Sequence, residues 1–367
     1  MIYLDNGATS FPKPPQVCRA VGEALSRAAN PGRGGYGAAM EAARIVFDCR
    51  EQAAELFSCK PEQVVLTANC THALNIAIES MIKPGSRVLI SGFEHNAVTR
   101  PLYARDCKVK FAGRRLFCWE ALLEDFRREL RQGVDGAVFT HVSNVFGYIL
   151  PVKEMAALCR EAGVPFILDA AQSAGSLEVD MGALGAEFIA MPGHKGLLGP
   201  QGTGLLLCGS PGKPLIYGGT GTASRERGMP EALPERQEAG TLNVPGAAGL
   251  AAGIRLVRSL TPEKIFARGH SQTVACARGL EKLGFRVFTG PHQAMSLSFQ
   301  GRGDCEELAS FLAGRGIAVR AGLHCAPLAH ESAGTLEKGT VRVSFGHDAS
   351  PAQTRALLGA LGGKCVN

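Results

Sequence analysis

The stretch "GAVFTHVSNVFGYILPVKEMAALCREAGVPFILD" (residues 136–169) decides the fold that the sequence predicts. Its two ends, residues 136–142 and 164–169, are short continuous apolar runs, typical of strands that are buried on both faces. Between them, "VKEMAALCREAG" repeats apolar residues at intervals of three and four, which predicts a helix. A strand, a helix and a strand in this order are typical of a mostly parallel sheet covered by helices.

The same alternation continues on both sides of this stretch. Further strands are expected at "VVLT" (64–67), "RVLIS" (87–91), "EFIAM" (187–191) and "TGLLLC" (203–208), and further helices at "THALNIAIESMI" and "WEALLEDFRREL". Residues 217–246 are too polar for a core element and too long for an ordinary turn, so we expect a functional or intersubunit loop there. Helical patterns resume over 247–283, and shorter strands and helices follow. The sequence therefore predicts an α/β fold with a smaller α+β domain after it.

The composition excludes several classes of function. The 39 basic and 33 acidic residues give a net charge of +6, and the basic residues are scattered without interleaved aromatics, so we expect no nucleic-acid binding. The modest positive charge suits small anionic ligands. No apolar run is long enough for a membrane span, and Asp5 stands where a signal peptide would be apolar. The twelve cysteines include no CxxC pair, so we expect neither a metal site nor disulfides, and a reducing, cytoplasmic setting.

Polar side chains follow the predicted strands at the ends where ligands bind in open α/β sheets. Asp169 ends "VPFILD", and a carboxylate there can keep a pyridinium nitrogen protonated, although such an Asp is also a common helix N-cap. Lys195, in "MPGHKGLLGPQGTG", follows "EFIAM" and is flanked by glycines. It fits a lysine that forms a Schiff base, although a lysine in such a turn taken alone is more often an ordinary surface lysine.

Two further candidates follow other predicted strands. Thr71, in "LTANCTHALN", opens a predicted helix, where free N–H groups and a hydroxyl suit a phosphate, or where the threonine is a simple cap. His95, in "SGFEHNAVTRP", can stack on an aromatic ring, and the alternative is a histidine that faces solvent at a helix start.

A last candidate lies near the C-terminus, in "IAVRAGLHCAPLAH" (317–330). Cys325 stands in a stretch broken by Gly322 and Pro327, in which we expect no helix. The neighbouring His324 and Arg320 would supply positive charge that favours a reactive thiolate. A small buried hydrophobe is the alternative for this cysteine.

Taken together and in this order, the motifs resemble the class V aminotransferase family of fold-type I pyridoxal-phosphate enzymes, and most closely its cysteine desulfurase branch. The resemblance rests on "YLDNGATSFPKP", "NPGRGGYG", "EHNAVTRPL", "DAAQSAG", "PGHKGLLGPQGTG", "EAGTLNVPG", "RAGLHCAP" and "GTVRVSFG". The loop "R-x-G-x-H-C-A" looks like that of SufS-type and selenocysteine-lyase-like desulfurases. The family resemblance implies two domains. The large one, over 16–255, has a mostly parallel seven-stranded sheet. The small α+β domain, over 256–367 with 1–15 packed on it, carries the cysteine loop.

The resemblance also implies how pyridoxal 5'-phosphate is held. Lys195 matches the lysine that forms the Schiff base, Asp169 the partner of the pyridine nitrogen, and Gln172 the partner of the ring hydroxyl oxygen. His95 matches the histidine that stacks on the ring. The phosphate falls to Cys70 through its main chain, Thr71, His194 and, from the neighbouring subunit of a homodimer, Thr241.

For the reaction, the resemblance implies L-cysteine as the substrate, converted to L-alanine while Cys325 accepts the sulfur as a persulfide and passes it to a protein acceptor. The residues implied for substrate binding are Asn144, Arg320 and Arg342. Selenocysteine lyase activity at the same site stays open, as does aminotransferase activity or a role as a sulfur-carrier or regulatory partner. Pro192 stands where SufS-type enzymes have a serine, and Asn69-Cys70 where they have Gly-Thr, so the phosphate site departs from the pattern in detail.

Overall fold

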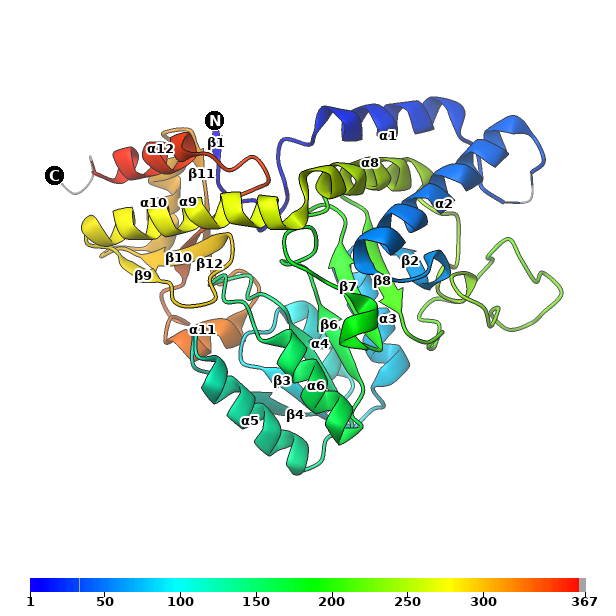
Figure 1. Cartoon of the computed structure of the whole chain (residues 1–367), viewed down its shortest axis with the longest axis horizontal. Helices are drawn as coiled ribbons and strands as arrows, with labels where there is room; N and C mark the ends of the chain where they lie inside the picture. The colour runs from blue at the N-terminus through cyan, green and yellow to red at the C-terminus, as the bar shows by residue number, and fades with distance from the viewer. Residues whose placement is uncertain (33, 363–367) are drawn as a thin grey trace.

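A computed structural model describes residues 1–32 and 34–362 of the chain. Arg33, in the quoted "NPGRGGYG", and residues 363–367, with Cys365 and the end of the predicted small domain, lie outside the described residues. The centre is a seven-stranded sheet in the order β2-β8-β7-β6-β5-β3-β4, in which only β8 runs against the others. The predicted mostly parallel sheet of seven strands is confirmed (Figure 1).

Six of the seven strands lie where the apolar runs predict them. Their bounds are β2 Val64–Thr67, β3 Arg87–Ser91, β5 Gly136–Thr140, β6 Phe166–Asp169, β7 Phe188–Pro192 and β8 Gly204–Cys208. The seventh, β4 (Lys108–Ala112), is missing from the predicted runs. Its sequence "KVKFA" alternates lysine with apolar residues because β4 is an edge strand that is buried on one face only.

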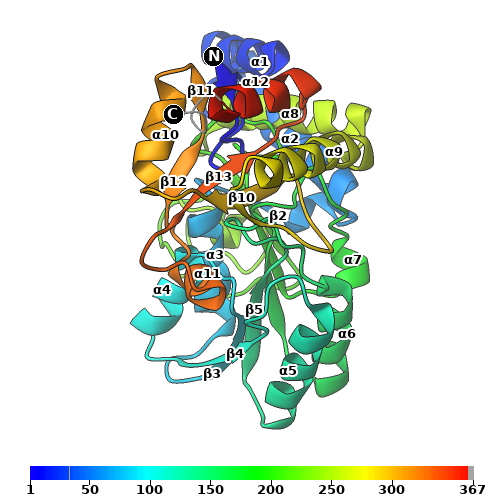
Figure 2. The ribbon, with the colours of Figure 1, turned by 90° about the vertical axis from the view of Figure 1, so that its left-hand side faces the viewer.

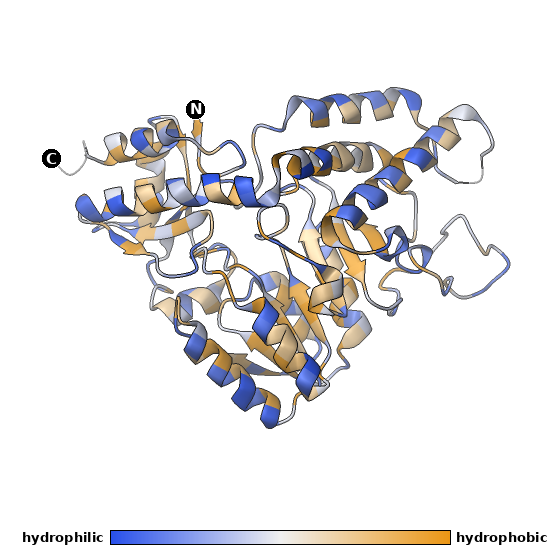
Figure 3. Ribbon diagram, in the orientation of Figure 1, coloured by the Kyte–Doolittle hydropathy of each residue, from blue (hydrophilic) through white to orange (hydrophobic). Residues whose placement is uncertain are grey.

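Alternate residues of the strands pack into two different cores, which explains the continuous apolar runs. Ile90, Val138 and Ile167 belong to one core, and Leu89, Phe139 and Leu168 to the other. The first core is covered by α3 (Cys70–Met81) and α4 (Asn96–Ala104). The second is covered by α2 (Gly37–Phe57), α5 (Trp119–Arg131), α6 (Val152–Ala162), α7 (Met181–Leu184) and α8 (Val244–Leu260). In Figure 3 the strands are accordingly coloured as hydrophobic along their length.

A second, smaller part of the molecule has its own core and its own sheets. Its four-stranded sheet has the order β12-β13-β10-β9, and the N-terminal strand β1 pairs in parallel with β11. The strand bounds are β1 Ile2–Tyr3, β9 Arg286–Phe288, β10 Ser296–Gln300, β11 Ile317–Ala318, β12 Arg320–Gly322 and β13 Thr340–Ser344. Figure 2 shows this part above the large sheet. The domain boundaries given above stay a prediction, which the separation of the sheets supports.

The helices that pack into the core of the smaller part are α9 (Pro262–Lys282), α10 (Cys305–Ala313) and α12 (Pro351–Gly362), whereas α11 (Pro327–Ala333) packs through Ala329 into the second core of the large sheet. The helical pattern over 247–283 is two helices, because Thr261 adopts a left-handed φ of 62° before Pro262 and so ends α8. The N-terminal helix α1 (Pro15–Arg27), with no element predicted for it, packs along α8.

The loop predicted over 217–246 is irregular over 217–234 and extends away from the body at the right of Figure 1, whereas Glu235–Gln237 form a short 3-10 helix and α8 already begins at Val244. In the described part of the chain, no helix combines the length and the hydrophobicity needed to cross a bilayer. Nor do residues 1–32 and 34–362 contain a group of three or more His, Cys, Asp or Glu side chains placed to hold a metal ion.

Candidate active site

The strands β2, β3, β5, β6 and β7 run in the same direction, so their carboxyl ends meet at one edge of the sheet. A cavity of about 110 Å³ lies at that edge. Eight of the predicted site residues line it, namely Cys70, Thr71, His95, Asn144, Asp169, Gln172, His194 and Lys195. Residues up to 125 positions apart in the sequence therefore meet because each follows a neighbouring strand.

Two glycines allow the turn after β6 to touch the turn after β7. A Cβ atom on Gly196 would lie 2.2 Å from the carbonyl oxygen of Ala174, and one on Gly175, whose φ is +87°, would lie 2.4 Å from the carbonyl oxygen of Gly196. Only glycine permits this approach, which brings Gln172 and Lys195 to the same cavity wall.

Asp169 ends β6 with its carboxylate buried in the cavity wall. Its Oδ1 accepts hydrogen bonds from the backbone N–H of Ala171 (2.9 Å) and from the Cys70 thiol (3.6 Å). No hydrogen bond from the described residues reaches Oδ2, which leaves that oxygen for a ligand. Burial raises the pKa of Asp169, since a desolvated carboxylate is costly, and the positive charge of Lys195 opposes that shift.

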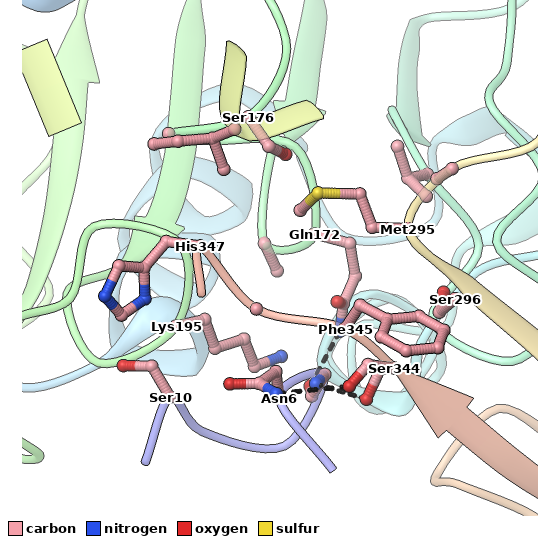
Figure 4. Close-up of a pocket in the computed structure, with 18 of the residues that line it drawn as sticks. Asn6, Ser10, Gln172, Ser176, Lys195, Met295, Ser296, Ser344, Phe345 and His347 are labelled. Carbon is pink, nitrogen blue, oxygen red and sulfur yellow. Dashed lines mark hydrogen bonds between the residues drawn. The ribbon is translucent and has the colours of Figure 1, made fainter. Parts of the chain in front are cut away.

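Lys195 lies between two cavities. It lines the cavity at the strand ends, and together with Gln172 it also lines a second cavity of about 50 Å³ that includes Asn6, Ser344 and His347 (Figure 4). Burial lowers the pKa of Lys195 below that of an ordinary lysine. A lysine with a lowered pKa carries more of the neutral amine that acts as a nucleophile or base, so the surface-lysine alternative does not fit.

The opposite end of the cavity suits an anion. α3 begins at Cys70, one residue before the predicted helix start, and the Asn69 side chain accepts a hydrogen bond from His72 N–H (2.9 Å). Cys70 and Thr71 both line the cavity, and their N–H groups at this helix N-terminus have no hydrogen-bond partner among the described residues. His194 adds a buried Nδ1 without a hydrogen-bond partner among the described residues. Pro192, the departure noted in the sequence, also lines this wall.

His95 is the N-cap of α4, where its Nδ1 accepts a hydrogen bond from Ala97 N–H (3.0 Å). Burial, with the positive charge of Lys195, lowers the pKa of His95 to about 4, so the ring is neutral at physiological pH. A neutral ring on the cavity wall is compatible with stacking and does not fit the alternative of a solvent-facing histidine.

The structure does not bring Arg320 and Arg342 into the lining of this cavity. Both guanidinium groups contact Asp5, with Arg342 Nη2 at 2.8 Å from Oδ1 and Arg320 Nε at 3.1 Å from Oδ2. Arg342 Nη1 also donates to the carbonyl of Asn144 (2.8 Å). Of the predicted substrate-binding residues, Asn144 therefore lies in the cavity wall and the arginines lie behind it.

The loop around Cys325 lies next to the same wall. The side-chain amide of Asn144 donates to the carbonyl of His324 (2.7 Å), and Asn96 N–H donates to the carbonyl of Cys325 (2.8 Å). His324 and Cys325 both have left-handed backbone conformations, with φ of 50° and 56°. The Cys325 side chain is exposed, which contradicts the alternative of a buried hydrophobe.

Two expectations about this loop are wrong. His324 does not supply positive charge, because it is buried and desolvation lowers its pKa far below that of an ordinary histidine. The positive charge of Arg320 is paired with Asp5. The stretch also contains a helix, since Pro327 opens α11 at the first helical position, where proline is favoured.

Thr241 lies away from this cavity, in the wall of two other hollows formed with the loop that precedes α8. Its side chain is exposed in the single chain. The structure of one chain therefore brings together every residue predicted for the cofactor except this one, which the resemblance assigns to a neighbouring subunit.

The sequence predictions gave no role to three charged residues that touch the site. Lys13 Nζ donates to the carbonyl of His194 (2.8 Å), next to Lys195, and burial lowers the pKa of Lys13 to about 8. Glu94, beside His95, is fully buried, and burial raises its pKa to about 8. Asp5 holds the two arginines. Asp5 and Lys13 are the two charged residues of the quoted "YLDNGATSFPKP". Their presence in a motif that carries the resemblance was the signal that could have identified them.

Comparisons with known proteins show which family has this sequence and fold. The family model for aminotransferase class-V matches residues 2–357. A probable cysteine desulfurase of Methanothermobacter thermautotrophicus is 34% identical over 98% of this chain and 93% of its own, and one of Pyrococcus abyssi is 33% identical over 98% and 93%. The apo structure of a cysteine desulfurase from Thermococcus onnurineus NA1 superposes with a TM-score of 0.93 at 30% identity, over 100% of this chain and 94% of that one. The chain therefore belongs to the aminotransferase class-V family and groups within it with proteins named cysteine desulfurases.

Proposed function

We propose that this protein is a pyridoxal-phosphate-dependent cysteine desulfurase that converts L-cysteine to L-alanine and takes the sulfur as a persulfide on Cys325. The observation that carries the proposal is the link between the two reactive groups. Lys195 and Asn144 line one cavity, and Asn144 hydrogen-bonds the loop of the exposed Cys325. An aminotransferase or a pure binding protein would have no use for an exposed thiol at this place.

The cavity fits the cofactor at both ends. The unbound Oδ2 of Asp169 would hold the proton on the pyridine nitrogen, and the N–H groups of Cys70 and Thr71 with His194 Nδ1 would hold the phosphate. Lys195 would bind the aldehyde carbon, and the neutral ring of His95 would cover the cofactor ring. Pro192 leaves one hydroxyl fewer for the phosphate than the SufS-type pattern has. Gln172 Nε2 donates one of its two N–H groups to the Gly7 carbonyl (2.9 Å), and the other would serve the ring hydroxyl oxygen.

When bound, the cofactor supplies an electron-withdrawing ring that stabilises negative charge at the substrate Cα. The Lys195 amine removes the Cα proton and later returns it, and its lowered pKa keeps enough neutral amine for this work. Asn144 orients the α-carboxylate, with Arg342 behind it. The Cys325 thiolate forms a bond to the substrate sulfur while the bond from that sulfur to Cβ breaks. The electron pair of that bond stays on the carbon fragment, which takes up a proton and leaves as L-alanine.

A homodimer and a protein acceptor complete the proposal. Thr241 is exposed and does not line the cavity; it lies in the wall of the same hollow as Met40 and Phe47 of α2, which are 53% and 50% exposed. A second copy that covers this face would carry Thr241 toward the phosphate end of its partner, which sedimentation can test. The exposed Cys325 can meet an acceptor after the transfer. We also propose a reducing, cytoplasmic location, because the eleven described cysteines are all free thiols.

The decisive experiment compares wild type and Cys325→Ala. Wild type should show the visible absorbance of the bound cofactor, fix it to Lys195 on borohydride reduction, and release equal amounts of alanine and acceptor-bound sulfur from L-cysteine. Cys325→Ala should keep the absorbance and lose alanine release by more than about 100-fold. Normal turnover of L-cysteine by the variant would overturn the persulfide step. A Cys325→Ala variant that still consumes L-selenocysteine would identify the site as one that serves both substrates.

A further inference from the structure

The carbonyl oxygen of His194, in the peptide bond that precedes Lys195, is the meeting point of four hydrogen-bond donors. Lys13 Nζ lies 2.8 Å from it and Thr9 Oγ1 lies 3.0 Å from it. Ser10 donates to it through its N–H (3.0 Å) and through its hydroxyl (3.1 Å). A carbonyl oxygen has two lone pairs, so these donors saturate it. All four come from the N-terminal segment, at least 181 positions away in the chain.

The turn that carries Lys195 does not fix this peptide bond by itself. Glycines at positions 193 and 196 flank it, and glycine leaves the backbone its widest range of conformations. Within the turn, the carbonyls of residues 193 and 195 accept hydrogen bonds from the N–H groups of residues 199 and 198. In the described part of the chain, the His194 carbonyl is bonded by the N-terminal segment alone. Ser10 of that segment and Lys195 both line the second cavity (Figure 4).

Lys13 is the charged donor of this set. Its ammonium also donates to Ser10 Oγ (2.8 Å), and no carboxylate among the described residues forms an ion pair with it. A partly buried ammonium without a carboxylate partner costs folding free energy. Burial lowers the pKa of Lys13 to about 8, so the group is still mostly protonated at neutral pH. Because a charged donor makes a hydrogen bond about twice as strong as a neutral one, Lys13 is the strongest of the four contacts.

We propose that Lys13 is a positioning residue that fixes the peptide bond between His194 and Lys195, and so keeps the Lys195 amine at the place from which it removes the Cα proton. This deepens the proposed function and rests on it. Lys13 does not line the cavity at the strand ends, so it acts through Lys195 and not on the substrate. Proton transfer depends steeply on position, since a misplacement of about 1 Å can cost about 100-fold in rate. Binding of the substrate carboxylate, assigned to Asn144, does not depend on this contact.

The test compares wild type with Lys13→Met, which keeps the length of the side chain and removes its charge and its donors. The kcat for alanine formation from L-cysteine, per bound cofactor, should fall by at least about tenfold. The KM for L-cysteine and the amount of bound cofactor should stay within about twofold of wild type. Lys264→Met, at an exposed position on α9, is the matched control and should leave all three values unchanged.

Amide hydrogen exchange of the cofactor-free protein tests the contact without the reaction. In Lys13→Met, the peptide that covers residues 193–199 should exchange several-fold faster than in wild type, because its turn has lost the strongest outside contact. Peptides from β5 and β6 should exchange at unchanged rates, since they make no hydrogen bond to Lys13.

An unchanged kcat per bound cofactor in Lys13→Met would overturn the proposal, and so would a loss confined to KM or to cofactor content, which would leave Lys13 a structural residue. Should Lys13→Met not fold, Thr9→Val removes a neutral donor to the same carbonyl at nearly constant volume. Its kcat should fall by at least about threefold at constant KM, and an unchanged kcat would count against the proposal equally. Failure of wild type to form alanine would instead overturn the proposed function, and unchanged exchange over 193–199 would still show that Lys13 does not fix the turn.

Discussion

The wall that carries Lys195 and the loop that carries Cys325 are neighbours with opposite physical characters. Lys195, Asp169 and His95 follow or end buried strands. Burial lowers the pKa of Lys195 and His95 and raises that of Asp169, and each shift favours the neutral form of the group. Cys325 is exposed, follows a residue with a left-handed backbone, and is joined to the wall by hydrogen bonds from Asn144 and Asn96 to carbonyls of the loop.

The difference follows from what each region has to handle. A group that moves a proton within one complex gains from a fixed, dry position, where burial tunes its pKa. A group that carries sulfur to another molecule has to be reachable, so it lies on a short loop and not on a strand end. The predictions below test how independent the two regions are.

The largest effect is expected for Lys195→Ala. Removing the amine should lower alanine formation from L-cysteine by at least about 1000-fold, because the proposal assigns to Lys195 both the link to the cofactor and the removal of the Cα proton. The rate at which a thiol reagent labels Cys325 should stay within about twofold of wild type, because the loop does not contact Lys195 in the described hydrogen bonds. A residual rate within tenfold of wild type would contradict the role of Lys195.

An intermediate effect is expected for Asn144→Ala, which cuts the hydrogen bond between the wall and the loop. Labelling of Cys325 by iodoacetamide should become several-fold faster, roughly as expected for the loss of a hydrogen bond worth about 1 kcal/mol. Cys18, an exposed thiol on α1, is the internal control and should react at an unchanged rate. Equal labelling of Cys325 in both proteins would show that this contact does not restrain the loop.

The smallest effect is expected for Glu94→Gln, behind His95. Burial raises the pKa of Glu94 to about 8, so the folded protein keeps a proton that the unfolded chain releases near pH 4. The folded state thus binds more protons between about pH 4 and 8, and the contribution of Glu94 to stability falls as pH rises through that window. The Tm of the variant relative to wild type should therefore increase from pH 5 to pH 8.

Glu331→Gln, an exposed position on α11 in the cysteine loop region, is the matched control for Glu94→Gln and should show no such trend. A flat Tm difference for Glu94→Gln as well would mean that Glu94 is ionised in the folded protein. Glu94 would then make no pH-dependent contribution to folding stability, and the buried wall would not differ from the loop in this respect.

Much of the architecture could be predicted from local patterns, and the failures have local reasons. Strands buried on both faces show as uninterrupted apolar runs, so β3 over 87–91 was predicted to the residue. The edge strand β4 was missed because its exposed face is lysine. Lys195 and Asp169 were found because strand ends mark ligand sites in such sheets. The charge of His324 was predicted wrongly because burial, which sets its pKa, is not visible in neighbouring residues.

The sequence by itself determined six of the seven strands of the large sheet, the candidate groups at the strand ends and the family, because these depend on residues close together in the chain or on motifs. The tertiary structure alone decided which groups are paired. Asp5 meets Arg320 and Arg342 across more than 300 positions, and Asn144 meets the Cys325 loop across 180. Such contacts arise from strand register between distant segments, and charge balance depends on distance and burial, which a linear pattern does not contain.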